Sequence, residues 1–183
     1  MITYLTGDIL FSKCQTLVNP INCKGAMGKG LALRFKKRFP GMYEKYKDYC
    51  NRGLISPGKL WLYKGKENWV LNFPTKDDWR NPSKEEYLIS GLEKFLQTYK
   101  DKGIKSVAFP LLGAGNGGLD RTTVIQIMDN HLSRCEIPVE IYTGYVPRSP
   151  MMIDCLEKLC GKLTDEQKTV IREQICCEDN NYK

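Results

Sequence analysis

Short apolar runs of strand length alternate along the chain with longer segments in which apolar residues recur at helical spacing. The predicted strands are residues 2–6, 15–18, 59–64, 68–73, 104–110 and 138–143. The predicted helices are residues 28–39, 42–53, 86–100 and 122–132. This alternation favours an α/β fold, with a mostly parallel or mixed sheet that helices cover on both faces and ligands at the carboxyl ends of the strands.

Prolines and capping signals predict where several of these elements begin and end. We expect the second strand to stop at Asn19-Pro20 and the fourth to stop at Pro74, because proline does not continue a central strand. Ser83 and Glu86 form the S-x-x-E pattern of a capping box before the third helix. Asp120 is suited to cap the fourth helix.

The length of 183 residues fits one domain with a single core. We expect a domain over residues 1–148 and a helical extension over 149–183, which packs on that domain without forming its pocket. Apolar runs fall short of the roughly 18–20 residues of a membrane span, and the first residues lack a secretory leader. The sequence therefore predicts a monomeric, cytoplasmic protein that does not contact membranes.

Cysteine and histidine usage argues against several chemistries. The chain has eight cysteines but no C-x-x-C pair, and His131 is its only histidine. Cysteine at this frequency, without an export signal, favours reduced thiols over a disulfide scaffold, and the spacing fits no zinc site. One histidine also gives little support to a Ser-His-Asp or Cys-His catalytic group. We therefore expect neither a metal nor a cofactor.

The net charge of +7 favours an anionic partner, either nucleic acid or a phosphorylated small molecule. Much of this excess is local, in groups of lysine and arginine that are also typical of a solvated helix face. These groups are Lys36, Lys37 and Arg38, and Lys45 and Lys47.

Two glycine-rich loops are the strongest signal for a binding site. One covers residues 25–30 and leads into a helix, and the other covers residues 113–118 and follows a strand. Glycine lets successive backbone N–H groups approach an anion, so two such loops suit a pyrophosphate, although tight turns also require glycine. Neither loop matches the P-loop pattern, which disfavours an ordinary ATPase.

Four motifs, in order, resemble those of the macrodomains that bind ADP-ribose. They are Thr6-Gly7-Asp8-Ile9, Asn19-Pro20-Ile21-Asn22 and the two glycine loops. The resemblance covers residues 1 to about 145 and implies a three-layer α/β/α sandwich with a mixed central sheet.

Further motifs are similar to one branch of that family, the terminal ADP-ribose glycohydrolases and the DNA ADP-ribosyl glycohydrolase antitoxins of DarT–DarG pairs. They are Met27–Ala32, Asn72–Lys76 with Trp79-Arg80, and Gly115–Leu119. The branch implies an enzyme that removes ADP-ribose with a lysine, here Lys76, and a partner ADP-ribosyltransferase toxin. Some protein-directed members carry an aspartate where this chain has Gly117, so an aspartate-assisted mechanism is disfavoured here.

The resemblance also implies a set of ligand-binding residues. Asp8 suits the exocyclic amine of adenine, Asn22 suits ribose hydroxyls and Tyr142 or Tyr145 suits stacking on adenine, whereas Asn19 is expected to brace its loop. As alternatives, Asp8 is a turn residue and the tyrosines pack at the core or rim. The expected ligand-binding set is Asp8, Ile9, Asn22, Met27, Gly28, Lys29, Gly30, Gly113, Ala114, Gly115, Asn116, Gly117, Gly118, Leu119 and Tyr142.

The function expected first is hydrolysis of the bond between ADP-ribose and a modified macromolecule, with DNA bases ahead of protein carboxylates. Trp79-Arg80 supports DNA, because an aromatic ring can stack on a base while arginine contacts phosphate. Lys76 acts either as a nucleophile or by electrostatic positioning. The alternatives are a non-catalytic reader of ADP-ribose and a deacetylase of O-acetyl-ADP-ribose.

Overall fold

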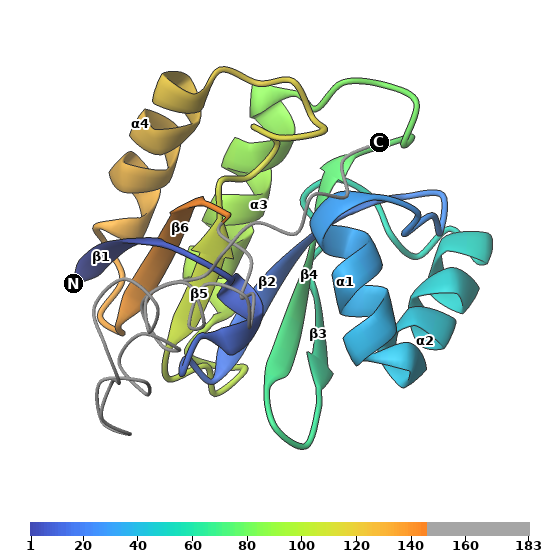
Figure 1. Cartoon of the computed structure of the whole chain (residues 1–183), viewed down its shortest axis with the longest axis horizontal. Helices are drawn as coiled ribbons and strands as arrows, with labels where there is room; N and C mark the ends of the chain where they lie inside the picture. Colours follow the sequence, from blue (N-terminus) through green and yellow to red (C-terminus); the bar gives the residue numbers. More distant parts are fainter. Residues whose placement is uncertain (146–183) are drawn as a thin grey trace, which may run out of the picture.

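A computed structural model describes residues 1–145, which form a six-stranded sheet with helices on both faces (Figure 1). The strands are β1 (Ile2–Thr6), β2 (Thr16–Asn22), β3 (Trp61–Lys64), β4 (Trp69–Lys76), β5 (Val107–Pro110) and β6 (Val139–Gly144). The helices are the short 3₁₀ helix η1 (Ile9–Phe11), α1 (Gly30–Arg38), α2 (Pro40–Asn51), α3 (Glu85–Thr98) and α4 (Arg121–Leu132). The expected boundary at 148/149 and the helical extension over 149–183 lie outside the described residues.

The strand order is β1-β6-β5-β2-β4-β3, and only β3 runs antiparallel to its neighbour. This confirms the mixed sheet of an α/β fold. One apolar core, which includes Phe35, Met42 and Tyr46, lies between the sheet and the layer of α1 and α2. A second core, which includes Leu92 and Met128, lies under α3 and α4 on the opposite face (Figure 1). The expectation of a single core is therefore wrong, because the sheet separates the apolar side chains of its two faces. The three layers expected from the resemblance are therefore present.

The expectation that β2 ends before Pro20 is wrong, because the strand continues to Asn22. The backbone N–H of Thr16 donates to Ser106, which directly precedes β5. N–H groups of successive residues face opposite neighbours, and residues 16 and 20 are four positions apart, so the nitrogen of Pro20 also faces the β5 side. Pairing between β2 and β5 stops at Leu17, so a proline three residues later removes no ladder hydrogen bond.

Pro74 does not end β4 either, for the same reason. The strand continues to Lys76, and the N–H of Trp69 donates to the carbonyl of Gln15 on the β2 side. The nitrogen of Pro74 therefore faces β3, whose pairing with β4 ends at Asn72. Both prolines lie beyond the last residue that pairs with the neighbouring strand, so one side of β2 and one side of β4 are unpaired at their carboxyl ends.

The expected capping box before α3 is also wrong. The N-cap residue is Lys84, which makes no side-chain cap hydrogen bond. Ser83 instead donates its backbone N–H to the carbonyl of Gly117 at 2.9 Å, which ties the chain to the second glycine loop before the helix begins. The cap of α4 is confirmed, because the Asp120 carboxylate accepts the N–H of Thr123 at 2.8 Å.

Candidate functional site

A cleft of about 970 Å³ opens at the carboxyl ends of β2, β4 and β5. Its walls come from both glycine loops, from the start of α1 and from the segment between β4 and α3. The lining residues are Pro20, Ile21, Asn22, Ala26, Gly28, Lys29, Gly30, Leu31, Ala32, Thr75, Lys76, Trp79, Arg80, Ser83, Pro110, Leu111, Gly113, Gly115, Asn116 and Gly117. Its position is the one expected for a ligand site in an α/β sheet.

A smaller cavity of about 100 Å³ adjoins the cleft, and Leu31 and Pro110 line both spaces. The other residues around it are Gly7, Ile9, Arg34, Tyr142, Gly144 and Tyr145. The two spaces together form one elongated site, with the small cavity at one end and Lys76 in the larger part.

Most of the ligand-binding residues expected from the sequence line one of these two spaces. Five do not, and they are Asp8, Met27, Ala114, Gly118 and Leu119. Asp8 and Met27 are buried behind the site. Gly118 and Leu119 help to close the second loop, since the N–H of Leu119 donates to the carbonyl of Gly113 and that of Gly118 donates to Gly115.

The two glycine loops meet at Gly30 and Asn116. Gly30 has a φ of +55°, and a β-carbon there would lie 2.7 Å from Nδ2 of Asn116. The positive φ favours glycine at position 30, and a β-carbon there would also displace the end of the Asn116 side chain. This contact joins the two loops that the sequence shows as separate motifs.

The second glycine loop has no room for a side chain at Gly117. A β-carbon there would collide with the carbonyl oxygen of Gly113 and with Oγ of Ser83. An aspartate at this position would require the loop to shift. Asp120, the nearest acid along the chain, is bound to the N–H and hydroxyl of Thr123, and these hydrogen bonds lower the pKa of its carboxyl group.

Lys76 ends β4 and directs its amine to the second loop. Its Nζ donates to the carbonyl oxygen of Asn116 at 2.8 Å. Its own carbonyl accepts a hydrogen bond from the Cys23 thiol at 3.3 Å, on the neighbouring strand end. Within residues 1–145, Lys76 forms no ion pair with a carboxylate. The amine of this half-buried lysine is thus held at the wall of the cleft by the backbone carbonyl of Asn116 and is not paired with a described acid.

The two asparagines of the second motif differ in their contacts. Asn22 closes the first glycine loop: its Nδ2 donates to the carbonyl of Ala26 at 2.6 Å, and its Oδ1 accepts the N–H of Lys24 at 2.9 Å. Asn19 instead donates to Oδ1 of Asn72 on β4 at 3.0 Å, and its own Oδ1 is buried without a partner among the described residues. Nδ2 of Asn19 also lies 4.0 Å from Sδ of Met27 in the first glycine loop, so both Asn19 and Asn22 hold this loop.

Asp8 lies at the start of η1, beside the small cavity. One carboxylate oxygen accepts the N–H of Leu10 at 3.0 Å, and the other is paired with Arg34 of α1. Nη1 of Arg34 is buried without a hydrogen-bond partner in the described part of the chain, and the guanidinium lies 4.5 Å from the ring centre of Tyr145. Arg34 was not expected from the sequence, because its spacing marks it only as a polar position on a helix.

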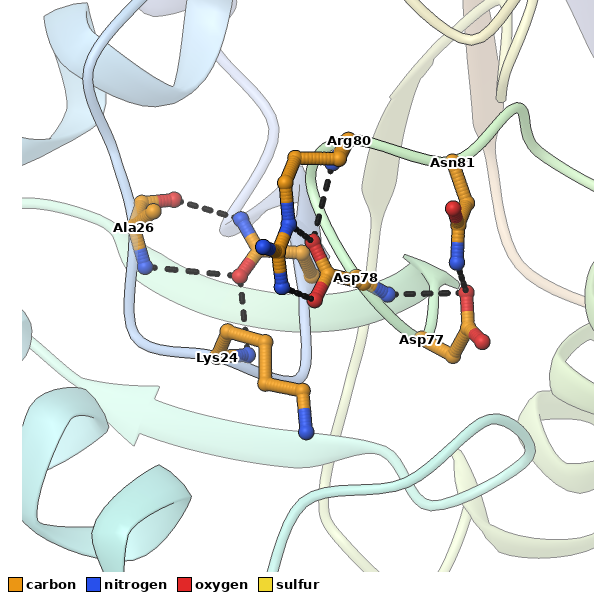
Figure 2. A network of polar contacts seen from close by, with 7 residues as sticks. Lys24, Ala26, Asp77, Asp78, Arg80 and Asn81 are labelled. Atoms are coloured by element: carbon orange, nitrogen blue, oxygen red, sulfur yellow. Dashed lines mark hydrogen bonds and ion pairs between the residues drawn. The ribbon is translucent and has the colours of Figure 1, made fainter.

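Arg80 lines the cleft, and Asp78 holds its guanidinium through the hydrogen bonds drawn in Figure 2. Its Nε donates to Oδ1 of Asp78 at 2.9 Å and its Nη2 to Oδ2 at 2.7 Å. These hydrogen bonds hold the pKa of the Asp78 carboxyl well below its usual range. The guanidinium also lies 5.6 Å from the ring centre of Trp79, which is 57% exposed. The rim therefore presents an exposed aromatic ring beside a pre-positioned cation.

Ser83 is a second lining residue whose role the sequence did not predict. It is buried, and its Oγ has no hydrogen-bond partner among residues 1–145. The S-x-x-E pattern assigned it to a helix cap, and only the tertiary approach of the second glycine loop places it in the cleft. Its hydroxyl is thus available to a ligand or to a bridging water.

Metal-binding clusters and membrane-spanning helices are both absent from residues 1–145. No group of three or more histidine, cysteine, aspartate or glutamate residues in this part is arranged to hold a metal ion. No helix in the same part has the length and apolar character needed to cross a membrane.

Comparisons with known proteins agree with this geometry. A sequence model of the Macro domain matches residues 18–128. The DNA ADP-ribosyl glycohydrolase of Mycobacterium tuberculosis is 45% identical over 130 residues, covering 69% of this chain and 37% of that protein. A DNA ADP-ribosyl transferase-DNA ADP-ribosyl glycohydrolase fusion protein of Thermosipho africanus is 38% identical over 168 residues, covering 81% of this chain and 43% of that protein.

A solved structure of Thermosipho africanus DarTG in complex with ADP-ribose superposes with a TM-score of 0.74 and 39% identity. The match covers 82% of this chain and 43% of that chain. The chain spans less than half the length of these curated relatives.

Proposed function

The chain belongs to the Macro domain family, and from that premise we propose that it is an ADP-ribosyl glycohydrolase that removes ADP-ribose from DNA bases. The observation that carries the proposal is the fixed amine of Lys76, held 2.8 Å from the Asn116 carbonyl in a cleft with two glycine loops. A protein that only bound ADP-ribose would need the loops but no amine beside the ribose.

The proposed ligand lies along the elongated site. Its adenine occupies the small cavity near Ile9 and Tyr142, and its pyrophosphate lies across the backbone N–H groups of both glycine loops. The loops are joined at Gly30 and Asn116, so both can contact one pyrophosphate. The distal ribose then reaches the part of the cleft that Lys76 lines.

Lys76 acts on the bond between the distal ribose and the acceptor. As that bond breaks, its electron pair leaves with the acceptor and positive charge develops at the ribose carbon. A neutral amine can attack this carbon, whereas an ammonium group orients the substrate through hydrogen bonds and favours departure of the acceptor. Water completes the hydrolysis in either case. The second glycine loop supplies no carboxylate to assist, since Gly117 stands in place of the aspartate and Asp120 caps α4.

The rim supports DNA as the acceptor. Trp79 is exposed for stacking on an unpaired base, and Asp78 holds Arg80 where it can contact a phosphate. The names of the two curated relatives refer to DNA ADP-ribosylation, and one of them also contains the transferase. We therefore also propose a partner ADP-ribosyltransferase that makes the modification. Separately, we propose that the chain acts as a monomer.

A side-by-side assay tests this proposal. Single-stranded DNA and a protein, each carrying labelled ADP-ribose, are incubated with the full chain, and the label released from each is measured. We expect faster release from DNA. Faster release from protein would contradict the choice of DNA, release of label from neither would favour the reader, and hydrolysis of O-acetyl-ADP-ribose alone would favour the deacetylase.

A further inference from the structure

The net positive charge of the chain comes from one segment. Residues 24–47 contain eight of the 28 lysines and arginines but only one acid, Glu44. This segment carries a formal charge of +7, which equals that of the whole chain, because the remainder has 20 basic and 20 acidic residues. The segment covers the first glycine loop, α1 and most of α2, so its charge lies on one of the three layers (Figure 1).

Most of this charge is not neutralised within the described residues. Arg34 is paired with Asp8, and Arg38 is paired with Glu67. The six lysines of the segment form no ion pair within residues 1–145. They are Lys24, Lys29, Lys36, Lys37, Lys45 and Lys47. Asp48, the next acid along α2, is already paired with Arg52 at 3.1 Å.

Two of these lysines meet over one aromatic ring. Nζ of Lys36, on α1, lies 4.2 Å from the ring centre of Tyr43, and Nζ of Lys47, on α2, lies 5.8 Å from it. Two ammonium groups thus lie close to one half-buried ring. Neither is paired with a carboxylate of the described residues, so their mutual repulsion is not offset by an acid. An approaching anion would relieve that repulsion.

This surface is continuous with the cleft. The first glycine loop packs on α2, where a β-carbon on Gly25 would lie 3.7 Å from Cα of Lys47. The exposed Lys24 directly precedes that glycine, and Lys29 lines the cleft itself. Lys24 also lies near Asp78, which holds Arg80 at the rim (Figure 2). A DNA strand that leaves the cleft at this rim can therefore pass Lys24 and reach Lys47 and Lys36.

We propose that Lys24, Lys36, Tyr43 and Lys47 form a docking surface for the backbone of single-stranded DNA outside the modified nucleotide. This inference rests on the proposed function, because the strand that binds the surface is the one that carries the ADP-ribose. Lysines placed at intervals supply phosphate contacts without reading sequence, and Tyr43 adds an aromatic face. The cleft can hold only the ADP-ribose and the modified base, and this surface would bind the neighbouring nucleotides of the strand.

A matched pair of charge-reversal variants tests this surface. K36E/K47E alters it, and K94E/K105E places the same change of net charge on α3 and before β5, at two exposed lysines outside it. Fluorescence anisotropy measures binding of an unmodified single strand of about 20 nucleotides, which exceeds the site size of a typical single-strand-binding domain. We expect K36E/K47E to bind about tenfold more weakly than K94E/K105E at low salt.

Salt dependence separates phosphate contacts from a general loss of stability. Affinity for a single strand falls with salt, and each phosphate contact contributes about 0.7 to the steepness of log affinity against log salt. Loss of two contacts in K36E/K47E should therefore make this slope shallower by about 1.4. We expect K36E/K47E to bind free ADP-ribose with the affinity of the unmodified protein, as measured by calorimetry. Equal affinity would show that the variant is folded.

Turnover on two substrates keeps this inference distinct from the proposed function. K36E/K47E should raise KM for an ADP-ribosylated strand of about 20 nucleotides and leave KM for an ADP-ribosylated mononucleotide unchanged. Equal DNA affinity and equal salt slopes in the two charge variants would overturn the docking surface, and so would tighter binding of RNA of the same sequence. Absence of hydrolysis on every substrate would overturn the proposed function, while the anisotropy result would still decide whether DNA binds here.

Discussion

Gly30 and Asn116, 86 positions apart in the chain, approach so closely that a β-carbon at position 30 would lie 2.7 Å from the Asn116 amide nitrogen. This approach brings the two glycine loops together at the cleft, where we propose that they bind one pyrophosphate. Nζ of Lys76 donates to the backbone carbonyl of the same asparagine. Asn116 therefore contacts both the proposed catalytic lysine and the first glycine loop.

The first prediction concerns Gly30→Ala. The left-handed φ of +55° costs an alanine roughly 1–2 kcal/mol, and the new methyl group displaces Asn116. We expect ADP-ribose affinity to fall at least about tenfold by calorimetry, which is about 1.4 kcal/mol.

Gly53→Ala is the matched control, because Gly53 also has a positive φ, of +67°, but a β-carbon added there would meet nothing within 4 Å beyond its chain neighbours. It should lower the melting temperature without changing ADP-ribose affinity. Equal losses of affinity in both variants would mean that backbone strain alone, rather than the contact between the loops, explains the effect.

The second prediction concerns Lys76. Lys76→Ala should keep ADP-ribose binding within about tenfold, or roughly 1.4 kcal/mol, while turnover falls much further, because the loops bind the ligand and the amine acts on the ribose bond. Calorimetry and label-release assays measure the two quantities. Lys94→Ala, an exposed lysine on α3, is the control.

Lys76→Arg distinguishes the two roles of the lysine. Arginine keeps the positive charge but does not supply a neutral amine near neutral pH. An inactive arginine variant favours the nucleophile, and substantial activity favours electrostatic positioning. Full turnover by Lys76→Ala on both DNA and protein substrates would remove Lys76 from the mechanism.

The third prediction concerns Asp78 and Arg80. Asp78→Asn should raise KM for ADP-ribosylated DNA about as much as Arg80→Ala does, because Asp78 acts by holding the guanidinium. The double variant should be no worse than Arg80→Ala, since the two residues act as one unit. Additive effects in steady-state kinetics would show that Asp78 has a separate role.

The same pair predicts a pH dependence of stability. Hydrogen bonds from Arg80 hold the pKa of Asp78 below its unfolded value of 3.8, so its contribution is present above about pH 4 and is lost as the pH falls further. Urea unfolding between about pH 5 and pH 3 should be less steeply pH-dependent in Asp78→Asn than in the unmodified protein. Identical slopes would contradict this assignment.

The fourth prediction concerns two thiols at alkaline pH, those of the half-buried Cys23 and the buried Cys135. Burial raises the pKa of Cys23 and Cys135 from 9.0 to about 11. In the unfolded chain these thiols ionise first, so the free energy of unfolding should fall as the pH rises from 9 to about 11. In Cys23→Ala/Cys135→Ala this fall should be smaller, as measured by urea unfolding. A fall of the same size in the variant would contradict the prediction.

The fifth prediction is that free ADP-ribose binds without a metal ion. The proposed pyrophosphate contacts are backbone N–H groups of two glycine loops, which need no cation to bind an anion. Calorimetry should therefore give the same affinity with and without EDTA. Loss of binding on chelation, or tighter binding of ATP than of ADP-ribose, would contradict it.

The sequence by itself determined the order of strands and helices, the α/β class and the two glycine loops, because hydrophobic spacing and glycine are local signals. The resemblance of short motifs to macrodomains also selected Lys76, Trp79 and Arg80, and all three line the cleft. Local signals failed at Pro20 and Pro74, since a proline is tolerated or excluded according to whether the neighbouring strand still pairs at that point, and that depends on other parts of the chain.

Only the tertiary structure decided how these motifs combine. Ser83 matches a helix cap by spacing, yet the return of the second glycine loop holds its backbone and leaves its hydroxyl in the cleft. The partners of Asn22 and Arg34, and the meeting of Lys36 and Lys47 over Tyr43, likewise depend on packing between elements distant in sequence. Sequence spacing encodes contacts within one helix or strand, whereas a site at the ends of several strands is set by the sheet that aligns them.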